Sequence, residues 1–126
     1  MIEINNLSSF RISRARFSTV AKIVLKGENR VREKISLAFV NKAEIKKLNK
    51  KFRNKNRETD VLSFELDNGY LGEVVICPEV VKTEKEQIKV FIHGILHLLG
   101  YEHEKSKKES ELMEKKQEKY FIKVFN

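Results

Sequence analysis

The stretch IKVFIHGILHLLGYEH, residues 88–103, contains all three histidines of the 126-residue chain. His93 and His97 are four residues apart, so on a helix their side chains project from the same face. The apolar residues of the stretch form one broad arc on nearly the opposite face: Ile88, Phe91, Ile92, Ile95, Leu96 and Leu99. The pattern therefore predicts a helix that buries one side and presents two imidazoles to a cleft.

Two imidazoles at this spacing are typical of a zinc site, where each ring nitrogen lies about 2.0–2.1 Å from the metal. Gly100 follows the last apolar residue of the helix and can adopt the left-handed conformation that ends a helix. We expect that turn to bring His103 back as a third ligand. Three protein ligands leave a fourth position for water, as in catalytic zinc sites. The alternative, a surface histidine pair on an amphipathic helix, accounts less well for a pattern that holds every histidine.

The residue after the first histidine separates this pattern from that of the zincin proteases. Those enzymes carry HExxH, and the glutamate serves as general base. The corresponding residue here is Gly94, so peptide hydrolysis in the zincin manner is disfavoured. Two acids, Glu102 and Glu104, flank the third histidine. Two interpretations of them stay open: groups that orient the ligands or accept a proton, or exposed acids that follow a helix.

Outward from this helix, the hydrophobic periodicity predicts an α+β single domain over residues 1–126, with a mixed, roughly four-stranded sheet flanked by helices. Alternation predicts strands near residues 2–4 and at 34–40, 61–66 and 71–77. Helical spacing predicts helices over about 17–25, 42–52, 81–99 and 107–124. The pair Asn68-Gly69 is a turn signal, so the last two strands should form an antiparallel hairpin.

Capping residues mark the ends of two of these helices. Ser13 and Gly27 bracket the first helix, and Asn41 with Glu44 three residues later resembles a capping box at the start of the second. The apolar residues expected to be buried on the second and last helices are Ile45, Leu48 and Phe52, and Leu112, Met113, Tyr120, Phe121 and Val124.

Positive charge is concentrated in one segment. The chain has 26 basic and 18 acidic residues, a net charge of +8. Residues 42–57 hold eight of the basic residues and only one acid, Glu44. Such a patch attracts polyanions, although a solvated lysine-rich helix face is the alternative interpretation.

The composition predicts a cytoplasmic protein without a membrane partner. No stretch approaches the roughly 20 apolar residues that span a bilayer, and the N-terminus lacks the features of a signal peptide. The single cysteine, Cys77, cannot form an internal disulfide and is expected to be a small buried residue in a strand.

Three segments resemble the YbeY endoribonucleases, a family also described as rRNA maturation factors. The family's ending, H-G-x-L-H-L-x-G-Y-D-H, is matched by residues 93–103, with Glu102 where Asp is usual. An arginine followed by T-D-V-L-S-F is matched by Arg53 and residues 59–64. A third segment, L-G-D-I-V-I-C, is similar to residues 71–77.

The resemblance implies a zincin-like fold, one zinc ion per chain and endonucleolytic cleavage of single-stranded RNA. It further implies processing of the 3′ end of 16S small-subunit ribosomal RNA and a part in ribosome quality control. It assigns importance for catalysis to Arg53 and His93. We expect Arg53 to clamp a phosphate, and Lys50, Lys51, Lys55 and Arg57 to follow the RNA backbone.

Two other functions fit the same residues. One is a ribosome-assembly binding factor that the metal stabilises and that catalyses little. The other is a metal hydrolase acting on peptides or small amides, which the missing glutamate and the concentrated positive charge disfavour.

Overall fold

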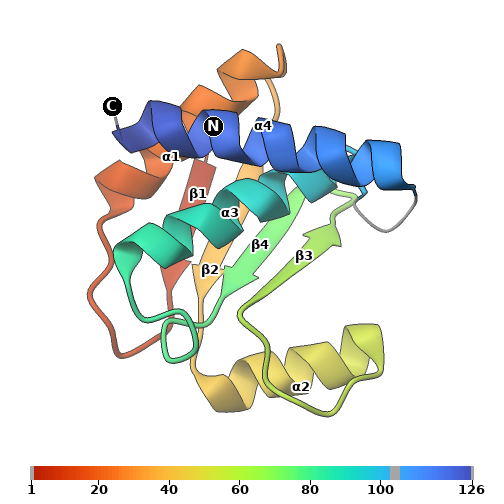
Figure 1. Ribbon diagram of the computed structural model, residues 1–126. Helices are drawn as coiled ribbons and strands as arrows, with labels where there is room; N and C mark the ends of the chain where they lie inside the picture. Colours follow the sequence, from red (N-terminus) through yellow and green to blue (C-terminus); the bar gives the residue numbers. More distant parts are fainter. Residues whose placement is uncertain (1, 103–105, 126) are drawn as a thin grey trace.

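The computed structural model describes residues 2–102 and 106–125 (Figure 1). Its elements follow the predicted order and lie within a few residues of the predicted bounds: β1 (Ile2–Asn6), α1 (Arg14–Gly27), β2 (Ile35–Phe39), α2 (Lys42–Arg53), β3 (Val61–Glu65), β4 (Gly72–Ile76), α3 (Glu84–Leu98) and α4 (Lys107–Phe125). In the described part of the chain, no helix is both long and apolar enough to cross a membrane.

The strands form one mixed sheet in the order β1-β2-β4-β3. The pairs β1–β2 and β2–β4 are parallel, whereas β3 pairs antiparallel with β4 and lies at the edge of the sheet. Gly69, at φ +87°, occupies the turn that joins them. The predicted α+β class, mixed sheet and hairpin are therefore confirmed.

The helices cover the two faces of the sheet unequally. Three of them, α1, α3 and α4, lie on one face, and α2 lies on the other (Figure 1). Strand alternation explains this division, because Leu37 and Val74 face the larger core while Ala38 and Val75 face the smaller one. The smaller core contains Ala38, Val40, Ile45, Leu62, Val75 and Cys77.

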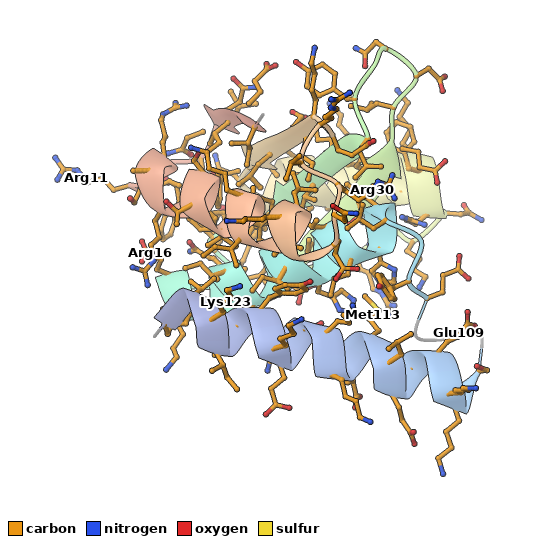
Figure 2. The ribbon with its side chains drawn as sticks, turned by 90° about the horizontal axis from the view of Figure 1, so that it is seen from above. Arg11, Arg16, Arg30, Glu109, Met113 and Lys123 are labelled. Atoms are coloured by element: carbon orange, nitrogen blue, oxygen red, sulfur yellow. The ribbon has the colours of Figure 1, made fainter. Side chains whose placement is uncertain are left out.

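Helix α4 packs on α1 and α3 as an outer layer, and Met113 points from it into the space that they share (Figure 2). In this position, only a narrow stripe of α4 is buried. Met113 and Tyr120 are buried as predicted, whereas Leu112 is 45% exposed, contrary to prediction.

Helix α1 begins as the sequence predicts but ends differently. The Ser13 side chain accepts a hydrogen bond from the backbone N–H of Arg16 at 3.3 Å. At the other end, Asn29 rather than Gly27 adopts the left-handed conformation, with φ 61°. A Cβ on Gly27 would overlap the ring of Tyr120, so the glycine serves the close approach of α4.

For α2, the predicted N-cap position is confirmed, but the predicted capping bond and one predicted buried residue are wrong. Asn41 occupies the N-cap position, but its side chain makes no capping bond. The Glu79 carboxylate caps the helix instead, accepting from the backbone N–H of Lys42 at 2.9 Å. Phe52 does not join the buried stripe, because its side chain is 54% exposed.

Candidate functional site

Helix α3 places two of the predicted ligands side by side. His93 and His97 are both half-buried, and their Nε2 atoms are 2.9 Å apart. The ring centroids are 4.5 Å apart and the ring planes are nearly perpendicular. The opposite side of α3 is buried in the larger core, so this helix presents the imidazoles while its apolar face anchors them.

A residue that the sequence analysis missed orients the first imidazole. The Oε1 atom of Gln117, on α4, lies 2.7 Å from His93 Nδ1. Because a carbonyl oxygen only accepts, this geometry makes Nδ1 of His93 the donor, and in a neutral ring the Nε2 atom then carries a lone pair next to His97. Gln117 has helical spacing with the buried residues Met113 and Tyr120. A polar residue on an otherwise apolar stripe is the sequence signal that points to it.

The pair fits a tetrahedral metal. Two nitrogens bound at about 2.0–2.1 Å in a tetrahedral site would lie about 3.3 Å apart, so 2.9 Å requires only a small separation. The third predicted ligand, His103, and the flanking Glu104 lie outside the described residues. Within residues 2–102 and 106–125, no group of three or more His, Cys, Asp or Glu side chains is placed to hold a metal. The structure therefore brings together two of the three predicted ligands.

The glycine between these histidines is required by packing. A Cβ at Gly94 would lie 2.9 Å from Val74 Cγ1 and 3.1 Å from Ser63 Oγ. Helix α3 can approach β3 and β4 this closely only because residue 94 has no side chain. A glutamate there would press into the sheet, which agrees with the absence of the zincin general base.

The histidines share a cleft of about 1170 Å³ with the predicted arginine. The cleft follows the edge strand β3, with α3 on one side and the end of α2 with its following loop on the other. Arg53 donates from Nη2 to the backbone carbonyl of Ser63 at 2.7 Å, and its guanidinium carbon lies 6.0 Å from the centroid of the Phe64 ring. These contacts position the arginine at the mouth of the cleft.

The charges of the cleft are divided between its parts. Three of the four residues predicted to bind RNA line it: Lys51, Lys55 and Arg57. Lys50 is exposed on α2 and is not among the lining residues. The acidic residues of the lining are Glu65, Glu73 and Glu102. The positive charge therefore lies on the α2 wall and its loop, whereas the carboxylates lie on the sheet and after α3.

Comparison with known proteins adds independent information. The family model described as Endoribonuclease YbeY matches residues 3–124. The chain belongs to the YbeY family. Among its relatives, an Endoribonuclease YbeY of Bdellovibrio bacteriovorus is 46% identical over 99 residues, which are 71% of this chain and 65% of that protein. One of Thermotoga maritima is 43% identical over 101 residues, 72% of this chain and 67% of that protein.

The fold is also that of a solved structure. The solution structure of the Thermotoga maritima protein TM1509 aligns with a TM-score of 0.70 and 34% identity. The alignment covers 99% of this chain and 89% of that one. The YbeY-family chain therefore retains nearly the whole architecture of its neighbour.

Next to the site, a buried carboxylate ties three elements together. Glu28, directly after α1, is only 7% exposed and accepts hydrogen bonds from Tyr101 at 2.5 Å, from Lys116 at 3.1 Å and from Tyr120. Burial alone raises the pKa of this carboxyl, but the three donors outweigh burial and lower the pKa below its ordinary value. Tyr101 lies two residues before His103, so Glu28 anchors the segment that leads to the third predicted ligand.

Proposed function

We propose that this chain is a zinc-dependent endoribonuclease that acts on single-stranded RNA. The observation that carries the proposal is one cleft holding both a pair of imidazoles with adjacent Nε2 atoms and an arginine fixed on the edge strand. A metal site beside a phosphate-binding cation is one combination that can catalyse phosphodiester hydrolysis. The names of the relatives support endoribonuclease activity.

In this proposal, His93, His97 and His103 hold one zinc ion. When bound, zinc supplies Lewis acidity and lowers the pKa of a water molecule that it holds to about 7. Gln117 keeps the proton of His93 on Nδ1, so that Nε2 remains available as a ligand atom.

Arg53 binds the scissile phosphate. Its guanidinium has five N–H donors, and the bond to the Ser63 carbonyl uses one of them. A planar fork of donors can contact two phosphate oxygens together and stabilise the charge that develops on them. Lys51, Lys55 and Arg57 attract the backbone on the same side of the cleft. The Glu102 carboxylate at the opposite side is suited to accept the proton of the attacking nucleophile.

The biological substrate that we propose is ribosomal RNA in the cytoplasm, at the 3′ end of the 16S species, with the small ribosomal subunit as partner. The net charge of +8, concentrated in residues 42–57, supports a large polyanion rather than a small substrate.

The first test is cleavage of a labelled single-stranded RNA by the purified protein. We expect His97→Ala and Arg53→Ala to abolish cleavage, and Lys89→Ala, an exposed change on α3 outside the cleft lining, to leave it intact. Elemental analysis should find zinc in the protein with Arg53→Ala and little in the one with His97→Ala. Equal cleavage by the His97→Ala protein would show that the activity belongs to a contaminating nuclease.

A second test addresses the ribosomal substrate. The protein should shorten the 3′-extended 16S precursor RNA to its mature end when that RNA is present in small subunits. Cleavage of free RNA without this shortening would separate the ribonuclease activity from the proposed biological substrate.

Two further measurements distinguish the alternatives. A structural zinc would make the domain unfold when a chelator removes it, whereas the proposed catalytic zinc should leave the helical circular dichroism largely intact. Peptidase activity in a nuclease-free preparation would support a peptide hydrolase. The close packing of Gly94 against Val74 and Ser63 argues against that function, because it leaves no room for the zincin glutamate.

A further inference from the structure

One aromatic ring lies exposed inside the cleft. Phe52 is 54% exposed, although the helical pattern of α2 places it on the apolar stripe. It packs against Phe64, with the two ring centroids 4.8 Å apart and the ring planes inclined at 55°. Among the exposed large hydrophobic side chains of the described residues, Phe52 is the one that lines the cleft.

Cations flank this pair of rings. The ammonium nitrogen of Lys51 lies 5.2 Å from the centroid of the Phe52 ring, and the guanidinium carbon of Arg53 lies 6.0 Å from that of Phe64. Sites that bind single-stranded nucleic acid combine these two features, because the ring stacks on a base while neighbouring cations contact the phosphates. Both cations come from the same turn of α2 as Phe52, so a base on the ring would have its phosphates within reach of them.

Cations beside an exposed ring are not sufficient by themselves. Phe125, at the end of α4, is 38% exposed and has Arg16 and Lys85 within 4.9 and 5.5 Å of its ring centroid. That ring does not line the cleft, whereas Phe52 shares the cleft with Arg53 and the histidines. The position in the cleft is therefore what points to a ligand.

We propose that Phe52, supported by Phe64, is a stacking platform for an unpaired nucleobase next to the scissile phosphate. The inference rests on the proposed ribonuclease function and adds the group that selects single strands. The faces of a paired base are covered by its neighbours in a helix, so only a splayed base can cover the ring. Every base has such a face, so the platform predicts selectivity for single strands with little preference among bases.

The test measures RNA binding on a His97→Ala background, so that the RNA is not cut. Fluorescence anisotropy compares a labelled single-stranded RNA of about ten nucleotides with the same RNA in which the bases are replaced by abasic sites. Loss of one base–aromatic stack weakens binding by between about 5-fold and 150-fold. We expect Phe52→Ala to weaken binding of the normal RNA by this factor and to leave binding of the abasic RNA unchanged.

Matched variants identify stacking as the cause. Phe52→Tyr should retain the affinity, whereas Phe52→Leu, which keeps an apolar side chain without a ring, should lose it. Phe125→Ala removes a second exposed, cation-flanked ring outside the cleft and should have no effect. Because the chain has no tryptophan, Phe52→Trp introduces a single tryptophan that can be excited selectively over the three tyrosines, and normal but not abasic RNA should quench its fluorescence.

The outcomes separate this inference from the proposed function. If RNA binds but Phe52→Ala changes nothing, or weakens normal and abasic RNA equally, the platform is wrong and the ribonuclease proposal stands. If neither RNA binds to the His97→Ala protein and the wild-type protein cleaves no RNA, both proposals are overturned.

Discussion

The contact between Gly94 and Val74 can be tested by a pair of substitutions. In Gly94→Ala, the new methyl group would lie 2.9 and 3.1 Å from the two methyl groups of Val74, which is fully buried. Forced overpacking of a core costs about 1–3 kcal/mol. Alanine also favours a helix by about 1 kcal/mol over glycine. We therefore expect Gly94→Ala to lower the free energy of unfolding by about 1 kcal/mol.

The partner substitution should relieve the crowding. Val74→Ala alone removes two buried methyl groups, at about 0.8 kcal/mol each for transfer plus a cavity term, about 2.5 kcal/mol in total. In the double variant, the methyl group at position 94 enters the space that the valine leaves, and the helix preference of alanine remains. The free energy of unfolding of the double variant should then fall by about 1.5 kcal/mol. If the two substitutions acted independently, it would fall by about 3.5 kcal/mol.

Urea denaturation followed by circular dichroism gives the four free energies of this cycle. The control replaces Val75, the next residue of β4, which faces the smaller core on the other side of the sheet. Gly94→Ala and Val75→Ala should be additive to within about 0.5 kcal/mol. Additivity of the Gly94 and Val74 substitutions as well would refute the claim that this contact sets the distance between α3 and the sheet.

Three further outcomes follow from the site. Gln117→Leu should weaken zinc binding about 10- to 100-fold in a chelator competition, whereas Gln117→Glu, which keeps an acceptor for His93, should not. Equal zinc affinity of both variants and the wild-type protein would show that Gln117 does not support the metal site. The pKa of Glu28 is lower in the folded protein than in the unfolded chain, where it is about 4.5, so the ionised carboxylate stabilises the fold. This stabilisation is complete above the unfolded pKa and is lost as the pH falls through the folded pKa. Glu28→Gln should therefore make stability less dependent on pH below about 4.5, and the exposed change Glu111→Gln serves as the control. Lys55→Ala should reduce the log–log salt slope of RNA binding by about 0.7, whereas Lys50→Ala, outside the cleft lining, should change it less.

The features that the sequence predicted are those that depend on near neighbours in the chain. The spacing of His93 and His97 on α3, the left-handed Gly100 at φ +105° and the turn at Gly69 all follow from local conformational preferences. Apolar periodicity likewise predicted which face of α3 is buried, because residues three and four positions apart lie on the same face of a helix and are buried together.

The features that it missed depend on residues brought together by the fold. Gln117 is 24 residues from His93 in sequence, and Glu79 caps a helix that begins 37 residues earlier. Glu28 gathers its donors from α4 and from the end of α3. Phe52 satisfies the helical pattern of α2, but the packing of that helix on the smaller core leaves it exposed. A local pattern can single out Gln117 as a polar residue on an apolar stripe, but it does not identify the partner that the fold brings to any of these residues.

The two walls of the cleft belong to different hydrophobic cores, and a single residue of the edge strand connects them. The side chain of Ser63 faces α3, 3.1 Å from where a Cβ of Gly94 would lie, and its backbone carbonyl holds Arg53. A slip of β3 by one residue would turn Ser63 toward α2 and remove both contacts together. The segment TDVLSF therefore serves the packing of the fold as well as the chemistry of the site. Residue 63 must be small because α3 comes close to β3 at Gly94. A larger residue at either position would push the histidine helix away from the strand that holds the arginine.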